Sequence, residues 1–311
     1  MLLRPRTGRG GLSVRVGVVI LPERRWRHSG ELWRRAEDLG FDSAWMYDHL
    51  WWRSLSAGEW FATVPVLTAA ACATSRIRIG TLVTSPNFRH PVVTASEAMT
   101  VDDISGGRFT LGIGAGSPGA GDSGVVDDTV LTPGERADRF AEFVELTDRL
   151  LREPVTSYEG RFYRTSEARV IASCVQRPRV PFALAATGPR GLALVARYGQ
   201  GWVTLGPPAF PEGATPASCL AAVRDQTDRL RAACEAVDRD ADEIDRIFVA
   251  TPAAGDPLAS PESFEEMAVD YAKAGITHLV IHWPRAEGVY AGDPAMLERV
   301  ASEVLPRVRA L

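Results

Sequence analysis

Short apolar runs alternate along the chain with longer segments in which apolar residues recur at helical spacing. The runs are rich in Val, Ile and Leu and end at Gly, Pro or polar residues, as in Ile77–Val83 and Phe109–Ile113. Because they lack the polar alternation of a half-exposed strand, they are typical of strands that are buried on both faces of a parallel sheet. The pattern therefore predicts a repeated strand–helix unit.

Eight such units can be placed along the chain. The expected strands are Val14–Leu21, Ser43–Met46, Ile77–Val83, Phe109–Ile113, Val180–Ala186, Gly201–Leu205, Ile247–Thr251 and His278–His282. The expected helices cover Gly30–Leu39, a segment through Ala73, Pro91–Ile104, a segment from Thr132 to Arg152, Gly188–Tyr198, Ala217–Val237, Pro261–Ala274 and Pro294–Val308. Ser29, Thr132 and Thr187 are the expected N-caps. Val155–Tyr163 interrupts the repeat and predicts a small hairpin.

Eight parallel units of this length predict a (β/α)₈ barrel, and an open doubly wound sheet is the alternative. An open sheet would concentrate its chemistry at one glycine-rich loop, whereas here polar and glycine-rich segments follow several different strands. We expect residues 13–311 to form a single barrel domain and residues 1–12 to form a disordered tail.

Composition narrows the classes of partner. The formal net charge of −4 gives no reason to expect nucleic acid. No apolar run approaches the ~18 residues that span a membrane, and the start lacks the apolar core of a signal peptide. The four cysteines are far apart, with no C-x-x-C pair, which argues against zinc or disulfides and predicts a reducing cytoplasm.

Asp48-His49 comes just after the second expected strand, where a barrel places its active face. A histidine exchanges protons near neutral pH, and an adjacent carboxylate can influence it. A structural histidine is the alternative at this point. Trp51 and Trp52 follow, and they could wall an apolar pocket for a substrate or simply pack within a long loop.

Two further segments could hold a ligand. Gly112–Gly116 lacks the G-x-G-x-x-G dinucleotide pattern, so it either lets a ligand approach the backbone or only makes a turn. Ala185–Arg190 joins a strand to a helix N-terminus, where backbone N–H groups and Arg190 could bind phosphate. An ordinary capped helix is the alternative reading of that segment.

The remaining histidines give weaker indications of function. His90 precedes Pro91 and most simply starts a helix. His282 and Trp283 lie at the end of the last expected strand and could face the substrate. No carboxylates stand at metal-ligand spacing, so no metal is expected. The chain also lacks a G-x-S-x-G elbow and a phosphate-binding P-loop.

Four segments resemble the bacterial luciferase-like oxidoreductases, a (β/α)₈ family that uses FMN or the deazaflavin F420. They are GFDSAWMYDH (40–49), RIGTLVTSPNFRHPVVTASEAMTVDDISGGRFTLGIGAG (78–116), AATGPRGLALVARYGQGW (185–202) and the strand His278 to Trp283. The second segment looks most like the F420-dependent branch, which includes methylenetetrahydromethanopterin reductases and sugar-phosphate dehydrogenases.

The resemblance implies roles for individual residues. A non-prolyl cis peptide at Leu82–Val83 would support the ring from behind, and Asp48 and His49 would lie near the ring as catalytic residues. One departure matters: Ser117 stands where the sugar-phosphate dehydrogenases carry a catalytic glutamate, so their substrate should not be transferred. The cofactor-binding residues that the resemblance implies are Leu82, Val83, Ser85, Ala115, Gly116, Ser117, Ala185, Ala186, Thr187, Gly188, Pro189 and Arg190.

The resemblance leaves three functions open. The first is F420-dependent hydride transfer to or from a small organic substrate, with His49 as proton donor. The second is a reduced-FMN monooxygenase that acts on an apolar or aromatic substrate, and the third is a non-catalytic flavin-binding protein. Family likeness also implies a homodimer and a separate flavin or F420 reductase that supplies reduced cofactor.

Overall fold

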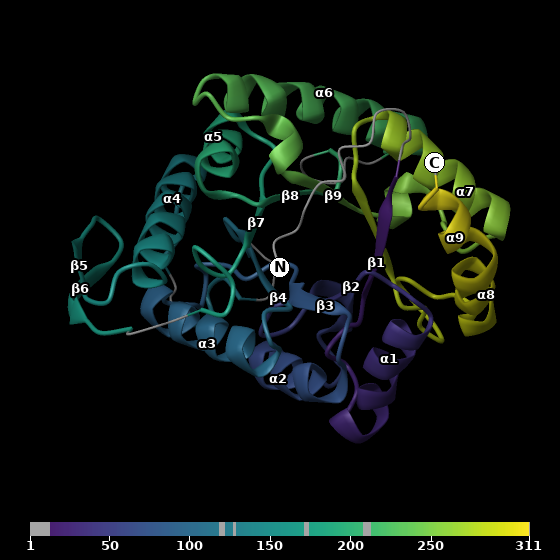
Figure 1. Cartoon of the computed structure of the whole chain (residues 1–311), viewed down its shortest axis with the longest axis horizontal. Coiled ribbons are helices and arrows are strands. Elements are labelled where there is room, and N and C mark those ends of the chain that lie inside the picture. The colour runs from purple at the N-terminus through teal and green to yellow at the C-terminus, as the bar shows by residue number, and fades with distance from the viewer. Residues whose placement is uncertain (1–12, 118–121, 127–128, 171–173, 208–212, 311) are drawn as a thin grey trace.

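The computed structural model describes residues 13–117, 122–126, 129–170, 174–207 and 213–310, so the expected tail at 1–12 lies outside the described residues. Its centre is a closed barrel of parallel strands in the order β1-β10-β9-β8-β7-β4-β3-β2, which confirms the predicted (β/α)₈ fold. Figure 1 shows the helices ringed around these strands. The barrel strands are β1 Arg15–Val19, β2 Ser43–Met46, β3 Arg78–Thr81, β4 Phe109–Gly114, β7 Phe182–Ala185, β8 Gly201–Thr204, β9 Asp245–Val249 and β10 His278–His282.

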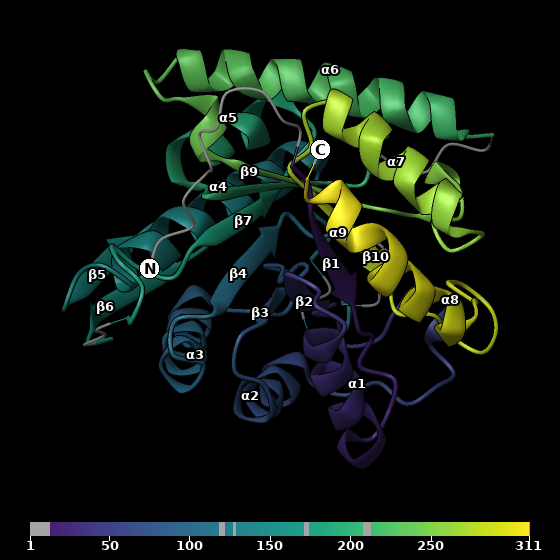
Figure 2. The ribbon, with the colours of Figure 1, turned by 45° about the vertical axis from the view of Figure 1, so that its right-hand side comes forward.

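The helices follow the strands in turn. In Figure 2, α1, α2 and α3 lie on one side of the strands, and α6 and α7 lie on the opposite side. The helices are α1 Trp26–Asp38, α2 Thr63–Ala73, α3 Pro91–Ile104, α4 Pro133–Leu150, α5 Pro189–Tyr198, α6 Pro216–Glu235, α7 Pro261–Lys273, α8 Pro294–Arg299 and α9 Leu305–Val308. No helix in the described ranges is long and apolar enough to cross a bilayer.

Two apolar clusters hold the barrel together, one on each face of its strands. Successive side chains on a strand point to opposite faces, so neighbours such as Trp202 and Val203 fall into different clusters. Trp45 fills the interior, and this requires Gly80 on the adjacent strand, because a Cβ there would lie 2.6 Å from the Trp45 ring. The interior is therefore packed with side chains below the site.

Several predicted details are wrong. Helix α1 begins at Trp26 and not after Ser29, because the Trp26 ring packs over Gly30 and the chain is already helical there. The side chain of Thr187 does not cap α5, whose N-cap is Gly188. The predicted final helix is divided by a π-helical segment, Val300–Val304.

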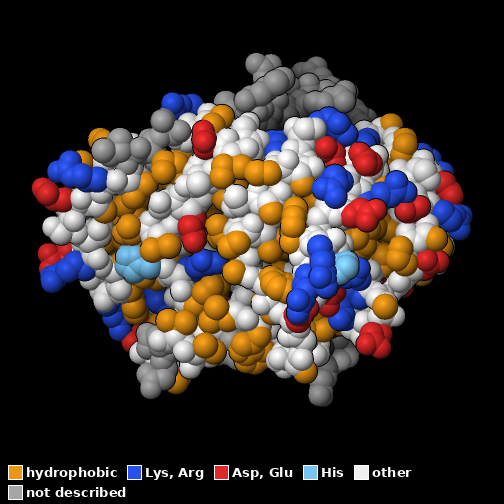
Figure 3. Space-filling model, turned by 90° about the horizontal axis from the view of Figure 1, so that it is seen from below, with side chains coloured by type: hydrophobic (Ala, Val, Ile, Leu, Met, Phe, Trp, Pro, Cys, Tyr) orange, Lys and Arg blue, Asp and Glu red, His pale blue; other side chains and the backbone are white. Residues whose placement is uncertain are grey.

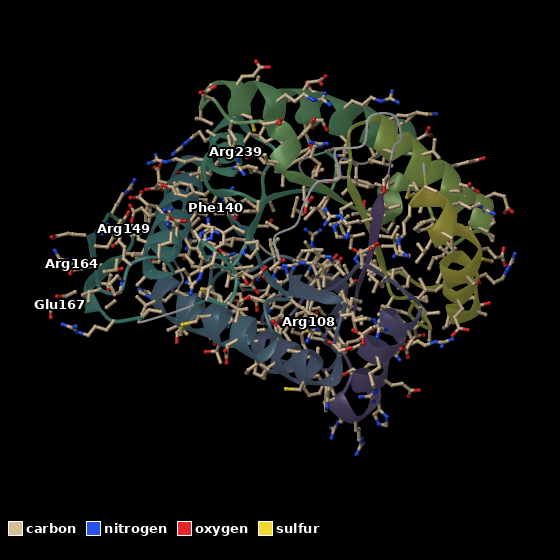
Figure 4. The ribbon with its side chains drawn as sticks, viewed as in Figure 1. Arg108, Phe140, Arg149, Arg164, Glu167 and Arg239 are labelled. Carbon is tan, nitrogen blue, oxygen red and sulfur yellow. The ribbon has the colours of Figure 1, made fainter. Side chains whose placement is uncertain are left out.

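The predicted hairpin exists but is longer than expected. It consists of β5 (Thr156–Glu159) and β6 (Arg164–Ala168), which pair in antiparallel fashion outside the barrel. Arg164 and Glu167, labelled in Figure 4, lie on it at the edge of the molecule. Its second strand is polar and carries no apolar run, which explains why the sequence pattern ended the hairpin too early.

Candidate functional site

A cavity of about 560 Å³ opens at the carboxyl ends of the barrel strands. This is the end where barrels of this type carry their sites. Its wall comes from segments that follow six of the strands. The residues predicted from the sequence that line it are His49, Trp52, Leu82, Val83, Ser85, Ala115, Gly116, Ser117 and Ala185.

The floor of this cavity is formed after β3 and β4. The Leu82–Val83 peptide is cis, as the resemblance predicts. Gly114 faces Val83 closely, since a Cβ at Gly114 would lie 2.7 Å from a Val83 methyl. The glycines of β4 therefore make room for Val83, and Gly116, with a φ of +75°, makes the turn that follows.

The imidazole of His49 enters the cavity with one nitrogen anchored. Its Nδ1 lies 2.7 Å from Oδ2 of Asp122. The other Asp122 oxygen accepts the backbone N–H of Leu50 at 2.8 Å, and the Trp60 indole donates to the His49 carbonyl oxygen. Asp122 was missed in the sequence analysis because it is 73 residues away along the chain and no local pattern connects the two.

Asp48, the adjacent carboxylate considered in the sequence analysis as an influence on His49, is held by other residues. The Asp48 carboxylate is buried and turned toward the helices, where it pairs with Arg89 at 2.7 Å and accepts the Thr84 hydroxyl at 2.8 Å. Burial lowers the pKa of Arg89, but the hydrogen bond to Asp48 and the negative charges of Asp48, Glu97 and Asp122 together outweigh this and leave that pKa raised. The side chains of Asp48 and His49 point in different directions because adjacent side chains at a strand end point to opposite sides.

An aromatic group closes one side of the cavity. The Tyr47 hydroxyl lies 2.7 Å from Nε2 of His282 and 3.2 Å from the Tyr290 hydroxyl, and the rings of His282 and Tyr290 stack 3.5 Å apart. Burial lowers the pKa of His282 to about 3, so the imidazole is neutral and Tyr47 can donate to it. Of the four predicted substrate residues, Trp52 lines this cavity and His282 lines an adjoining one.

The other two predicted substrate residues lie elsewhere. Trp51 is 37% exposed and does not line this cavity, and Trp283 packs against the outer apolar cluster. The sequence could not distinguish Trp51 from Trp52, because which of two neighbouring rings points inward depends on the short 3₁₀ turn Arg53–Leu55 that follows them.

A second cavity of about 820 Å³ adjoins the first and shares Ala115, Gly116 and Ala185 with it. It is lined by Ala186, Thr187, Gly188, Pro189 and Arg190, as well as by Phe140, which Figure 4 labels on α4. Arg190 also pairs with Asp138. The residues of the predicted phosphate segment thus come together at the N-terminus of α5, whose N-cap makes no side-chain hydrogen bond.

Hydrogen bonds of Asn87 hold the segment around Gly116 and Ser117, where the two cavities adjoin. Asn87 accepts a hydrogen bond from Arg139 at 2.6 Å and its amide donates to the Ser117 carbonyl oxygen. A side chain at Gly116 would lie 2.5 Å from the Asn87 amide oxygen. The described residues contain no group of His, Cys, Asp and Glu that could hold a metal, and all four cysteines are free thiols.

Known proteins resemble this chain over most of its length. The sequence model of the family described as luciferase-like monooxygenases matches residues 11–292. An F420-dependent glucose-6-phosphate dehydrogenase of Beutenbergia cavernae is 32% identical, covering 88% of this chain and 91% of the relative. A 5,10-methylenetetrahydromethanopterin reductase of Methanopyrus kandleri is 30% identical, covering 79% of this chain and 73% of the relative.

A solved structure matches the fold. An F420-dependent secondary alcohol dehydrogenase, in complex with an F420–acetone adduct, superposes with a TM-score of 0.79 over 96% of this chain and 99% of that chain. At 18% sequence identity, this likeness concerns the fold alone.

Proposed function

Because the chain belongs to the luciferase-like monooxygenase family, we propose that it is an F420-dependent oxidoreductase that transfers hydride to or from a small organic substrate. The observation that carries this proposal is the pair of joined cavities: one is lined mainly by apolar and aromatic side chains, the other by Arg136, Arg190 and the N-terminus of α5, and Arg53 lines both. The relatives with F420 in their names support the choice of cofactor.

The residues present fit such a cofactor. The first cavity, called here the inner cavity, has the apolar side chains of Leu82 and Val83 in its lining, which suits a ring. The second cavity, called here the outer cavity, offers Thr187, Gly188 and Arg190 at the start of α5. The N–H groups at a helix N-terminus and the helix dipole favour a phosphate there. A Cβ at Gly188 would meet nothing within 4 Å, so the helix end has space for a ligand.

The size of the outer cavity favours F420 over FMN. FMN ends at its phosphate, whereas F420 continues into an acidic tail. Arg136 lines the outer cavity and Arg53 lines both cavities, and arginine suits carboxylates and phosphates because its planar fork binds them bidentately. We assign these arginines to the acidic tail.

The cofactor, when bound, supplies or accepts the hydride. The chain's own residues hold the substrate over the ring, exclude water and move one proton at the substrate oxygen. We assign the proton transfer to His49, which lines the inner cavity and has its other nitrogen occupied by Asp122.

The inner cavity suits an uncharged substrate. Trp52, Tyr47 and Tyr290 form its aromatic wall, and the apolar side chains of Val203, Leu205 and Val249 also line it. Ser117 occupies the place of the glutamate in the sugar-phosphate dehydrogenases, so we propose a small alcohol or ketone and not a sugar phosphate.

The alternative is a reduced-FMN monooxygenase. The apolar inner cavity would suit its substrate equally, and the matching family bears that activity in its description.

Turnover distinguishes the two. The purified protein is mixed anaerobically with oxidised F420 and a panel of secondary alcohols, and the loss of deazaflavin absorbance is followed. We expect reduction with at least one alcohol and none with glucose 6-phosphate. No reduction with any alcohol, together with oxygen-dependent product formation with reduced FMN, would overturn the proposal in favour of the monooxygenase.

We further propose that the protein is a homodimer in which α2 and α3 form the contact. Helix α2 contains no charged residue, and α3 exposes Val93 and Ile104 to solvent. Figure 3 views the molecule from this side and shows apolar side chains gathered across the middle of the face. A face of this kind is typical of a subunit contact.

We also propose that a separate reductase supplies reduced cofactor when the protein works in the ketone-reducing direction, and that the protein works in the cytoplasm. The cytoplasmic assignment is supported by the four free thiols, three of which are buried.

A further inference from the structure

The Asp122 carboxylate is fixed from both sides. One oxygen accepts the backbone N–H of Leu50 at 2.8 Å, and the other lies 2.7 Å from Nδ1 of His49. The Asp122 side chain is fully buried, with 0% of its surface exposed. Each oxygen therefore has one assigned partner, and the carboxylate cannot rotate without breaking a contact.

We propose that Asp122 is a positioning residue that holds His49 with its Nδ1–H directed at the carboxylate and so presents Nε2 to the cavity as the proton acceptor. A carboxylate can only accept hydrogen bonds, so Nδ1 must carry the hydrogen that lies between them. Within the described part of the chain, Nε2 has no hydrogen-bond partner, and His49 lines the inner cavity. The inference rests on the proposed function for the substrate, but the tautomer itself does not.

The surroundings of His49 leave its ring little choice of orientation. The ring of Tyr47 meets it edge-on, with centroids 6.2 Å apart and planes at 89°. The Trp60 indole fixes the His49 backbone by donating to its carbonyl oxygen at 2.8 Å. Asp48, the neighbour in sequence, cannot take the place of Asp122, because Arg89 and Thr84 occupy its carboxylate.

This tautomer matches the oxidation of an alcohol. The carbinol C–H bond breaks and the hydride leaves with its electron pair for the deazaflavin, while the O–H bond breaks and its proton passes to Nε2 of His49. A carbonyl forms, the substrate loses two electrons, and the cofactor gains them. The resulting imidazolium is stabilised by the Asp122 carboxylate on its other side.

The substitution Asp122→Asn tests the tautomer sharply. The Leu50 N–H still requires an acceptor, so the new amide oxygen turns toward it and the NH₂ group faces Nδ1 of His49. That NH₂ group can only donate, so Nδ1 must become the acceptor and the hydrogen moves to Nε2. A single-atom change therefore reverses which ring nitrogen can take a proton.

The readout is the pair of ¹⁵N chemical shifts of the His49 ring, assigned by comparison with His49→Gln. We expect an Nδ1–H tautomer in the wild type and an Nε2–H tautomer in Asp122→Asn, with Asp228→Asn on the exposed face of α6 as the matched control that changes nothing. An Nε2–H tautomer in the wild type, or an Nδ1–H tautomer that persists in Asp122→Asn, overturns the proposal. The wild-type spectrum decides the tautomer even if the variant fails to fold.

Kinetics provide the second readout. In Asp122→Asn, kcat for alcohol oxidation should fall about a hundredfold or more, with the affinity for F420 unchanged. A parallel loss of F420 affinity would indicate a structural role and contradict a positioning one. If F420 does not bind the wild type at all while the tautomers follow the expectation, then the proposed function fails and the positioning by Asp122 stands.

Discussion

His49 and Asp48 are neighbours in sequence but lie on opposite sides of the end of β2. His49 lines the inner cavity, whereas Asp48 is buried toward the helices and bound by Arg89. A carboxylate held by a guanidinium and a hydroxyl fixes the loop after β3 relative to β2, and Asp48 is not among the residues that line the inner cavity. We therefore propose separate contributions, with His49 taking part in the chemistry and Asp48 fixing the shape of the site.

His49→Gln should lower kcat by about a hundredfold or more and leave the dissociation constant of F420 unchanged, because glutamine is similar in size but cannot exchange a proton. Steady-state rates and fluorescence titration measure the two quantities. The matched control is His28→Gln, an exposed histidine on α1, which should retain full activity. Equal rates for His49→Gln and the wild type would contradict the assignment of the proton transfer.

Glu37 should make stability depend on pH. Partial burial raises its pKa, but hydrogen bonds from the backbone N–H groups of Ile77, Arg76 and Ser75 outweigh this and lower it from 4.5 to about 2. Because the folded pKa is depressed, the stabilisation is fully present above pH 4.5 and is lost as the pH falls toward 2.

The unfolding free energy measured between pH 5 and 2 should therefore fall more steeply for the wild type than for Glu37→Gln, by at most about 1.4 kcal/mol per pH unit. Urea titrations at several pH values give the two slopes. Parallel slopes would show that Glu37 does not titrate in this range.

Local patterns predicted part of the site but not its long-range contacts. His49 could be found because it follows a strand, and Leu82–Val83 because a family likeness covers it. Asp122 could not be found, since its contact with His49 joins segments far apart in sequence. Tyr47 was passed over because a tyrosine that ends a strand resembles an ordinary core residue.

The strands and helices were predicted well because burial on both faces gives the strands continuous apolar runs. Caps were predicted where their partners are local: Thr132 forms a capping box with Glu135 three residues later. The prediction of Ser29 as an N-cap was wrong because the start of α1 is set by packing of Trp26 on Gly30, which a capping pattern does not contain. Element ends thus depend on contacts that sequence spacing alone cannot reveal.

Arg108 ties the end of α2 to β3 and to the turn before β4. Its guanidinium donates to Thr74 Oγ1, to the carbonyl oxygens of Ala71, Thr74 and Ile77, and to that of Ser105. A lysine has three donors on one atom and cannot span these acceptors.

Arg108→Lys should lower the free energy of unfolding by about 2–3 kcal/mol, since several carbonyls lose their partner. The matched control, Arg164→Lys on the exposed hairpin, should change it by less than about 0.5 kcal/mol. Figure 4 labels both arginines. Equal urea midpoints for the two variants would contradict the account of α2.

The closed barrel brings together residues that are distant in sequence. His49 follows β2, Asp122 follows β4 and Tyr290 follows β10, yet all three lie at the same end of the barrel. The fold class could be predicted from the alternation of elements, but the division of this end into two cavities could not, because it depends on side chains from six or more loops.

A charge placed at the proposed contact between α2 and α3 should separate the two subunits of the dimer. Val93→Glu, at a position 53% exposed on α3, should convert the dimer to a monomer, because a buried charge at a contact is costly. Val237→Glu, at a position 49% exposed after α6, is the matched control and should leave the dimer intact. Size-exclusion chromatography with light scattering measures the mass of each; a monomeric wild type, or identical masses for the two variants, would count against α2 and α3 as the contact.

Equilibrium titration shows whether the joined cavities hold F420. The purified protein is titrated separately with F420 and with FMN, and binding is followed by isothermal calorimetry. We expect F420 to bind at least about tenfold more tightly than FMN, a difference of about 1.4 kcal/mol, because only F420 carries the acidic tail that we assign to Arg53 and Arg136. Tight binding of FMN with no detectable binding of F420 would contradict it.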